Sequence, residues 1–393
     1  MPAPLWLWIG AALIAVAALA AAWVYLFGPW RAVDLDARAT APAPLLHASA
    51  AITDLDAWQA RRAELRALFE REVYGPMPHS LAPIVTRREA IAPEDLGGLE
   101  RVEQWRVELG PAGRFHLAIV RPQGDAPAPV LLVLDFCGNR AAFPGRPRAI
   151  APPVGYIQWF CRTAAIDPIV KAVFGPHING PPFELIASRG YAVAMLYAGD
   201  VVPDGAAHAR AALARFAPPR TGALMAWAWV ASRAYDALAA DPRFDARRIA
   251  LFGQSRQGKA ALIAGAFDDR FAAIVALQSG RGGDAPMRAF EGETLSHIVR
   301  TYPHWFAPDF GRRTPSVDQH QLLGLIAPRP LLLGDASRDR WSDPIGANAM
   351  RAAAAPAFSL FGEPPPLTFM RAGGHGIHRE DWLVALDFLD ARL

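Results

Sequence analysis

The stretch of sequence that decides the fold is LFGQSRQGK, residues 251–259. Apolar residues from 249 to 252 predict a short buried strand, and residues 259–267 are compatible with a helix. Between the two lie a glycine, Gly253, and a serine, Ser255. A strand, a tight turn and a helix in this order are typical of a nucleophile elbow, which projects a serine hydroxyl above a parallel sheet. The pattern predicts that Ser255 is a nucleophile, and an ordinary loop serine is the alternative.

Two details of this stretch are unusual. The common elbow has a glycine two positions after the serine, whereas Gln257 stands there in this chain and Gly258 follows it. The basic residues are nearly all arginines, and the only lysines are Lys171 and Lys259. Lys259 lies four residues after Ser255, which indicates that an ammonium group is required close to the serine.

Further segments of the chain alternate between strand and helix patterns. Helical spacing of apolar residues covers 54–74 and 223–240, and the short apolar or alternating runs that predict strands are 100–109, 114–120, 129–136, 190–197, 247–252, 271–277 and 329–333. Such alternation predicts a parallel sheet with helices on both faces. No internal repeat or second boundary is visible, so we expect one domain over residues 51–393.

Composition excludes several classes of function. The chain has 393 residues and a formal net charge of +3, and no basic cluster with interleaved aromatic residues is present, so a nucleic-acid partner is not expected. The histidines are dispersed and Cys137 and Cys161 lack the spacing of metal ligands, so we predict neither a metal site nor a cofactor. Whether the two cysteines form a disulfide stays open from the sequence.

The beginning of the chain is strongly apolar. Residues 5–27 contain no charged side chain, and as a helix they are long enough to cross a bilayer core of about 30 Å. Tryptophans and Tyr25 near the two ends suit the membrane interfaces. A cleaved signal peptide is the alternative, although it normally has basic residues first and a shorter apolar run. We therefore expect a transmembrane anchor within residues 1–30, a Pro/Ala-rich linker over 31–50, and a membrane-anchored domain in the periplasm or outside the cell.

A serine nucleophile needs a general base and an acid that orients the base. When an elbow serine comes first along the chain, the acid and the histidine follow in that order. The best base is His375, because it lies in a glycine-rich loop between a late strand and the closing helix; His378 is the rival. Two candidate acids follow the strand at 331–333. Asp339 lies deeper in the loop, whereas Asp335 is closer to the strand and is expected to be structural.

These residues resemble the glucuronoyl esterases, carbohydrate esterase family fifteen. The resemblance begins with Gly253-x-Ser255-Arg256-x-Gly258-Lys259, which accounts for the displaced glycine, and it covers roughly residues 50–393. Further matching stretches are Gln278-Ser279-Gly280-Arg281-Gly282-Gly283, Phe290-x-Gly292-Glu293-Thr294, Pro303-His304-Trp305-Phe306, Val317-Asp318-Gln319-His320 and Asp339-x-Trp341-x-Asp343-Pro344. It implies an α/β-hydrolase fold, a three-layer sandwich with a mostly parallel central sheet.

The resemblance also implies roles for individual residues. Ser255 would be the nucleophile and His375 the base, while Arg256 would stabilise the oxyanion. The residues that would contact the sugar of a uronate are Lys259, Glu293 and Trp341. The implied substrate is an alkyl or aryl ester of (4-O-methyl-)glucuronic acid in plant cell-wall polysaccharide, as found where xylan side chains join lignin.

One position departs from the family pattern. The usual acid comes immediately before the Ser-Gly-x-Gly-Gly segment, and this chain has Gln278 there. Some bacterial members resemble this chain in carrying the acid after the later strand, so we assign the acid to Asp339. Two alternatives remain at this stage: an acetyl-xylan or general carbohydrate esterase, and a non-catalytic, membrane-tethered carbohydrate-binding homologue.

Overall fold

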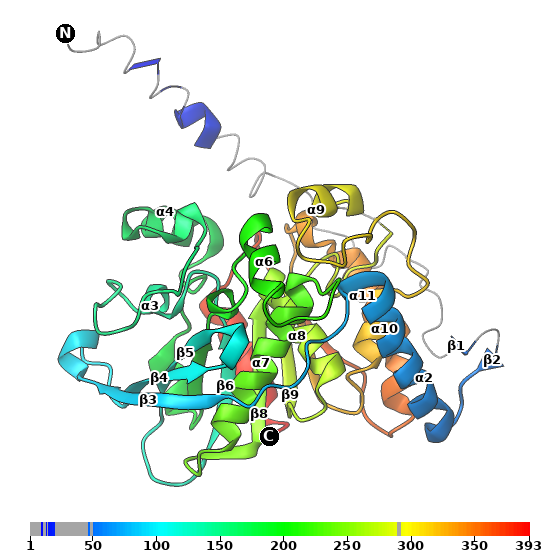
Figure 1. The fold of residues 1–393 in the computed structure, drawn as a ribbon, viewed down its shortest axis with the longest axis horizontal. Coiled ribbons are helices and arrows are strands. Elements are labelled where there is room, and N and C mark those ends of the chain that lie inside the picture. Colours follow the sequence, from blue (N-terminus) through cyan, green and yellow to red (C-terminus); the bar gives the residue numbers. More distant parts are fainter. Residues whose placement is uncertain (1–8, 11–12, 14, 20–45, 48–49, 289–291) are drawn as a thin grey trace.

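The structure is a computed structural model that describes residues 9–10, 13, 15–19, 46–47, 50–288 and 292–393. Its centre is a nine-stranded sheet with the order β11-β10-β9-β8-β6-β7-β5-β4-β3 (Figure 1). The strands are β3 (Ile84–Ile91), β4 (Val102–Glu108), β5 (Arg114–Val120), β6 (Ala128–Leu134), β7 (Ala192–Leu196), β8 (Phe244–Gln254), β9 (Ala273–Leu277), β10 (Leu331–Ala336) and β11 (Leu367–Arg371).

The six strands from β11 to β7 are mutually parallel, and β5, β4 and β3 continue the sheet with antiparallel pairings. The main helices are α2 (Leu55–Phe69), α4 (Asp167–Phe174), α5 (Phe183–Ser188), α6 (Ala206–Leu213), α7 (Ala223–Ala239), α8 (Arg256–Phe267), α9 (Leu295–Thr301), α10 (Gln319–Gly324), α11 (Pro344–Ser359) and α12 (Arg379–Asp390); α3 (Asn139–Ala142) is a single turn.

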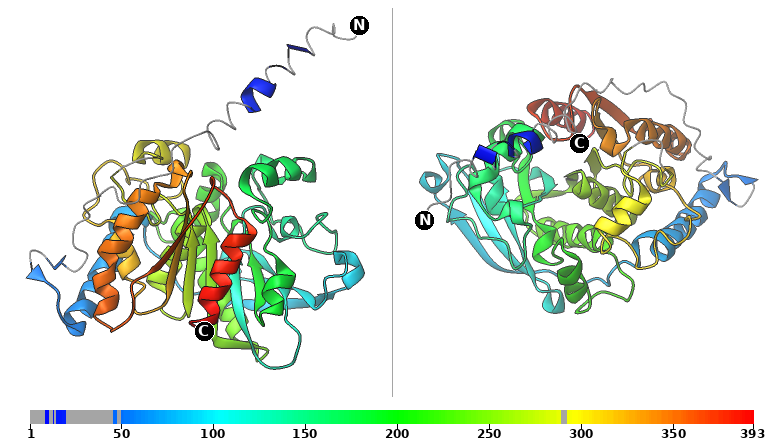
Figure 2. Two further views of the ribbon diagram at one scale, coloured as in Figure 1. Left: turned by 180° about the vertical axis from the view of Figure 1, so that it is seen from behind. Right: turned by 90° about the horizontal axis from the view of Figure 1, so that it is seen from above.

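Two hydrophobic clusters, one on each face, hold the sheet between its helices. Along β6, Leu132 belongs to one cluster while Leu131 and Val133 belong to the other, because successive side chains of a strand point to opposite faces. The larger cluster packs against α2, α7, α8, α10 and α11, and the smaller one against α5 and α12. Helices α7 and α8 lie in front of the sheet in Figure 1, and α12 (red) lies in front when the molecule is seen from behind in Figure 2. The predicted three-layer α/β architecture is confirmed.

Each strand expected from the sequence is present, with ends that differ by a few residues. The expectation missed β3, an antiparallel edge strand whose side chains are mostly exposed and include Arg87, Arg88 and Glu89. A strand with one neighbour and little burial needs no apolar run, so the hydrophobic pattern that identifies central strands is absent from it.

Most of the predicted anchor and linker lies outside the described residues. The described part of residues 5–27 is helical at 9–10, 13 and 15–19. Within the described ranges, no helix combines the length and the apolar character needed to cross a bilayer. At the end of the predicted linker, β1 (Leu46–His47) and β2 (Ala50–Ala51) form a short antiparallel pair.

Candidate active site

Ser255 occupies a strained turn between β8 and α8. Its backbone angles, φ of 54° and ψ of −126°, lie in a region that residues other than glycine rarely adopt. The backbone N–H of Ser255 donates to the carbonyl of Leu277 on the neighbouring strand β9 (2.8 Å), which helps to hold the turn. The structure thus has the local geometry of a nucleophile elbow at this serine.

The glycines around Ser255 are explained by close approach. A Cβ on Gly253 would lie 2.2 Å from the carbonyl oxygen of Gln257. A Cβ on Gly258 would lie 2.5 Å from Ser279 Oγ, whereas Gln257 fits as a buried side chain. The displaced glycine of the sequence motif is therefore the position where helix α8 approaches the segment that follows β9.

His375 lies in the loop between β11 and α12 and has a partner on each ring nitrogen. Its Nδ1 is 2.6 Å from Asp339 Oδ2, and its Nε2 is 2.9 Å from Gln254 Nε2. An amide nitrogen can only donate, so the second contact requires an unprotonated Nε2 and leaves the proton on Nδ1, toward Asp339. A general base needs this tautomer.

Asp339 is the carboxylate that the fold brings to this imidazole. It is 3 % exposed, and it also accepts a hydrogen bond from the backbone N–H of Ser342 (3.3 Å). Burial alone would raise the pKa of Asp339, but the contact with His375 outweighs it and brings the pKa below the ordinary value. Asp339 is therefore ionised at neutral pH.

The two rival residues have other surroundings. Asp335 lies in strand β10, and burial together with neighbouring carboxylates raises its pKa well above the ordinary value. His378 is the N-cap residue of α12, where its backbone N–H donates to Asp381 Oδ2 (2.7 Å).

The hydrogen bonds of the Gln278 amide go to the backbone beside the imidazole. Its Oε1 accepts from the N–H of Gly376 (2.7 Å), and its Nε2 donates to the carbonyl of the same residue (3.0 Å). Gln254 Nε2 also donates to Gln278 Oε1 (3.2 Å). An amide can make the donor and the acceptor contact at once, which a carboxylate cannot. Gln278 thus fixes the chain immediately after His375.

A cleft of about 570 Å³ opens over these residues, and its walls include Ser255, Arg256, Trp341, His375 and Phe174. This volume lies in the range of pockets that enclose small organic ligands. The site lies at the carboxyl ends of β8, β10 and β11, the edge where parallel α/β sheets usually bind their ligands.

A smaller pocket beside Ser255 contains the three predicted sugar-binding residues. Lys259 and Glu293 are each 4 % exposed, whereas Trp341 is 38 % exposed. Burial lowers the pKa of Lys259 to about 8, and burial raises the pKa of Glu293 although the Lys259 ammonium partly offsets this. Glu293 Oε1 is buried and has no hydrogen-bond partner among the described residues.

Arg256 follows the serine directly and lies against two aromatic rings. Its guanidinium carbon is 5.3 Å from the ring centre of Tyr302 and 5.1 Å from that of Trp305. Its Nη1 forms an ion pair with the Asp204 carboxylate. Sequence reasoning did not single out Asp204 or Gln254, because their contacts join segments that are far apart in the chain.

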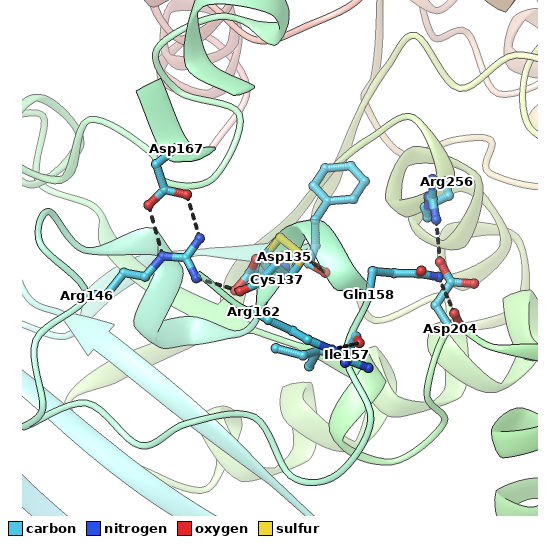
Figure 3. The surroundings of a disulfide bond; sticks show 11 residues. Asp135, Cys137, Arg146, Ile157, Gln158, Arg162, Asp167, Asp204 and Arg256 are labelled. Carbon is cyan, nitrogen blue, oxygen red and sulfur yellow. Dashed lines mark hydrogen bonds and ion pairs between the residues drawn. A yellow bond between two sulfur atoms is a disulfide. The ribbon is translucent and has the colours of Figure 1, made fainter. Parts of the chain in front are cut away.

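The two cysteines form a disulfide, a question that the sequence left open. Cys137 follows β6, and its Cα is 5.0 Å from that of Cys161. The closed segment is also held by Arg146, whose guanidinium pairs with both oxygens of Asp167 (Figure 3). Figure 3 also shows Gln158 of this segment beside Asp204, which in turn meets Arg256.

Comparison with known proteins identifies relatives with the same architecture. The family described as "Glucuronyl esterase, fungi" matches residues 216–362. The solved structure of a glucuronoyl esterase from Solibacter usitatus is 33% identical, with a TM-score of 0.75, and the match covers 90% of this chain and 98% of that one. A promiscuous esterase of carbohydrate esterase family fifteen from a marine bacterial metagenome is 29% identical, with a TM-score of 0.76 and coverage of 92% and 99%.

Curated proteins agree with these matches. A carbohydrate esterase from an unidentified prokaryote is 29% identical over an alignment of 391 positions that covers 89% of this chain and 89% of the relative. A 4-O-methyl-glucuronoyl methylesterase from Phanerochaete chrysosporium is 35% identical over an alignment of 167 positions that covers 39% of this chain and 35% of the relative. The chain is therefore a carboxylic ester hydrolase and belongs to the glucuronoyl esterase family.

Proposed function

We propose that this enzyme hydrolyses alkyl or aryl esters of (4-O-methyl-)glucuronic acid in plant cell-wall polysaccharide, through an acyl-enzyme on Ser255. The observation that carries the proposal is the pocket beside Ser255, which is lined by a buried ammonium, Lys259, and by a buried carboxyl group, Glu293. An ammonium donates hydrogen bonds and a carboxylate accepts them, so the pair suits the hydroxyl groups of a sugar ring.

Glu293 supports this proposal in a second way. A buried carboxylate oxygen without a partner is costly for the folded protein, and a ligand hydroxyl that donates to it removes that cost. The exposed ring of Trp341 on the cleft wall adds an apolar surface that can cover a sugar face. The printed names of several relatives, glucuronoyl esterase and 4-O-methyl-glucuronoyl methylesterase, point to the same class of ester.

The chemical steps assign one role to each residue. Ser255 Oγ attacks the ester carbonyl while its proton passes to Nε2 of His375, and Asp339 stabilises the resulting imidazolium through Nδ1. Arg256 offsets the negative charge on the carbonyl oxygen. The alcohol leaves with the proton from His375. Water then gives a proton to His375 and cleaves the acyl-enzyme, releasing the glucuronic acid and restoring the serine.

For this attack, His375 must exchange one contact for another. Its Nε2 now accepts a hydrogen bond from Gln254 Nε2, and the base has to accept the proton of Ser255 Oγ instead. Ser255 and His375 line the same cleft, so the exchange takes place within one site.

The test compares hydrolysis of benzyl glucuronate and of acetylated xylan by the parent enzyme and by Ser255→Ala. We expect the parent to prefer the glucuronate ester and the variant to lose activity by several orders of magnitude, since no other group forms the acyl-enzyme. A preference for acetyl esters would indicate a general carbohydrate esterase. Acetyl esters are included in the test because the marine relative is described as promiscuous. Sugar binding without turnover in the parent would indicate a non-catalytic homologue.

We also propose that residues 5–27 anchor the enzyme to a membrane, with the catalytic domain in the periplasm or outside the cell. The uncharged apolar sequence supports the anchor, as does the exposure of Ile9, Leu13, Val16 and Leu19, each more than half exposed. The disulfide supports an oxidising compartment. The full chain should sediment with membranes, and a chain that lacks residues 1–30 should not. A trimmed amino terminus on the mature full-length protein would show a signal peptide instead.

A further inference from the structure

Asp204 is a buried carboxylate at which three donors from two other segments meet. It lies between β7 and α6 and is 8 % exposed. Its Oδ2 binds the Arg256 guanidinium. Its Oδ1 accepts a hydrogen bond from Trp305 Nε1 (2.9 Å) and lies 2.8 Å from His304 Nε2. Burial alone would raise the pKa of Asp204, but Arg256 and the hydrogen bonds outweigh it and hold the pKa well below the ordinary value. Asp204 is therefore ionised at neutral pH.

The surroundings of Arg256 restrict the guanidinium on two sides. The rings of Tyr302 and Trp305 lie close to it, and Asp204 binds Nη1. Nε has no hydrogen-bond partner among the residues that the structure describes, and the side chain lines the cleft together with Ser255. Asp204 thus occupies Nη1, Nε is itself buried, and other atoms of the Arg256 side chain line the cleft.

The backbone of Asp204 also has a hydrogen-bond partner. Gln158 Nε2 donates to the carbonyl of Asp204, and Gln158 stands three residues before Cys161 in the segment that the disulfide closes (Figure 3). Four residues earlier, the Asp200 carboxylate accepts from the backbone N–H of Val154 (2.7 Å), which belongs to the same segment. The carboxylate that meets Arg256 therefore rests on a covalently closed loop rather than on a free one.

We propose that Asp204 is a positioning residue, which holds the Arg256 guanidinium in the one orientation where it meets the carbonyl oxygen of the ester as negative charge develops. The inference rests on the proposed ester hydrolysis at Ser255. Donors fixed in place before the reaction stabilise developing charge without reorganising, whereas a free arginine side chain has many rotamers and would have to be ordered in the transition state. The Asp204 carboxylate lowers the net positive charge near the oxyanion. Its contribution is therefore the orientation of the Arg256 guanidinium and not additional charge.

The test is a double-mutant cycle between Asp204→Asn and Arg256→Ala, measured on a glucuronate ester and on p-nitrophenyl acetate. In the parent background, Asp204→Asn should lower kcat by about 10- to 100-fold, with a smaller change in KM. In the Arg256→Ala background, the same change should alter kcat by less than about twofold, because the group that Asp204 positions is gone. An equal loss in both backgrounds would show that Asp204 acts without Arg256 and would overturn the inference.

A matched control is Asp241→Asn, which removes the charge of another buried aspartate that pairs with arginines, Arg243 and Arg88, away from the cleft. It should lower the melting temperature and leave kcat unchanged. If Asp204→Asn does not fold, Trp305→Phe replaces it in the cycle, since it removes one donor to Asp204 and keeps a ring beside Arg256. Failure of the proposed function is read separately, from the parent and Ser255→Ala alone: it shows as activity retained by Ser255→Ala, as a preference of the parent for acetyl esters, or as no turnover by the parent.

Discussion

At the scale of single residues, the active site depends on which of several similar side chains are charged. Asp339, Asp335 and Glu293 illustrate this: the pKa of Asp339 lies below its ordinary value beside His375, whereas the pKa values of Asp335 in β10 and of Glu293 in the pocket beside Ser255 are raised. The sequence alone gives no reason to expect different pKa values for these carboxyl groups. Burial and neighbouring charge separate them, because burial favours the neutral acid and a cationic partner favours the anion.

The role of Asp339 can be tested against Asp335. Asp339→Asn should lower kcat by about 10³- to 10⁴-fold, because the imidazolium formed during attack loses its counter-charge and the preferred tautomer. Asp335→Asn is the matched control: Asp335 lies within β10, and Asp339 is the carboxylate that binds His375, so this change should leave kcat essentially unchanged. Both are checked by steady-state kinetics and by melting temperature. A normal kcat with a lower melting temperature for Asp339→Asn would mean that this residue only stabilises its turn.

The pKa of Lys259 predicts how substrate binding depends on pH. Burial lowers it to about 8, so the ammonium is present below pH 8 and is lost as the pH rises through that value. If the ammonium binds sugar hydroxyls, KM for a glucuronate ester should rise by about tenfold between pH 7 and pH 9. Lys259→Met should have a KM that is high at pH 7 and changes little over the same range. A parent KM that is flat from pH 7 to pH 9 would contradict the assigned role.

At the scale of elements, the loop that carries His375 is held from three directions. The N–H of Ile377 donates to the carbonyl of Phe174 at the end of α4 (2.8 Å), and a Cβ on Gly376 would lie 2.1 Å from that same carbonyl oxygen. Gln278 binds Gly376 from the β9 side. From strand β11, Arg371 donates to the carbonyls of Gly374 (2.8 Å) and Gly376 (3.2 Å). A glycine-rich loop is thereby fixed by its neighbours rather than by its own sequence.

The ion pair between Arg371 and Asp381 provides a prediction about this loop. Both residues are buried, and Arg371 Nε lies 3.0 Å from Asp381 Oδ2. Arg371→Leu leaves a buried carboxylate without its partner and should lower the free energy of unfolding by about 3–5 kcal/mol in urea denaturation. The double variant Arg371→Leu/Asp381→Leu should recover part of that loss. If the double variant is less stable than the single one, the pair contributes more than its desolvation costs.

At the scale of the whole molecule, the disulfide joins the end of β6 to the segment that supports the cleft. The two cysteines are separated by 24 positions in the sequence. Closing a loop of this length lowers the entropy of the unfolded chain and should stabilise the protein by about 3 kcal/mol. We expect the variant Cys137→Ser/Cys161→Ser to lose about this much in urea denaturation. An unchanged stability, together with two free thiols in the denatured parent protein, would show that the bond does not form.

The sequence by itself determined the elements whose causes are local. The run from β8 through Ser255 to α8 was readable because the turn requires small residues at fixed positions, and the central strands were readable because burial on both faces requires unbroken apolar runs. Ser255, His375 and Asp339 could be named in advance as candidates from their places after strands. The exposed strand β3 could not, since little of it is buried and no apolar run marks it.

Only the tertiary structure decided which of these residues meet. The 2.6 Å contact between His375 and Asp339 joins residues 36 positions apart, and the ion pair between Asp204 and Arg256 joins residues 52 positions apart. Gln278 stands where the family usually has its acid, and its hydrogen bond to the backbone of Gly376 joins residues 98 positions apart. Patterns along the chain report what a residue needs from its immediate neighbours, whereas charge, burial and hydrogen bonding at the site are set by segments that the sheet brings together.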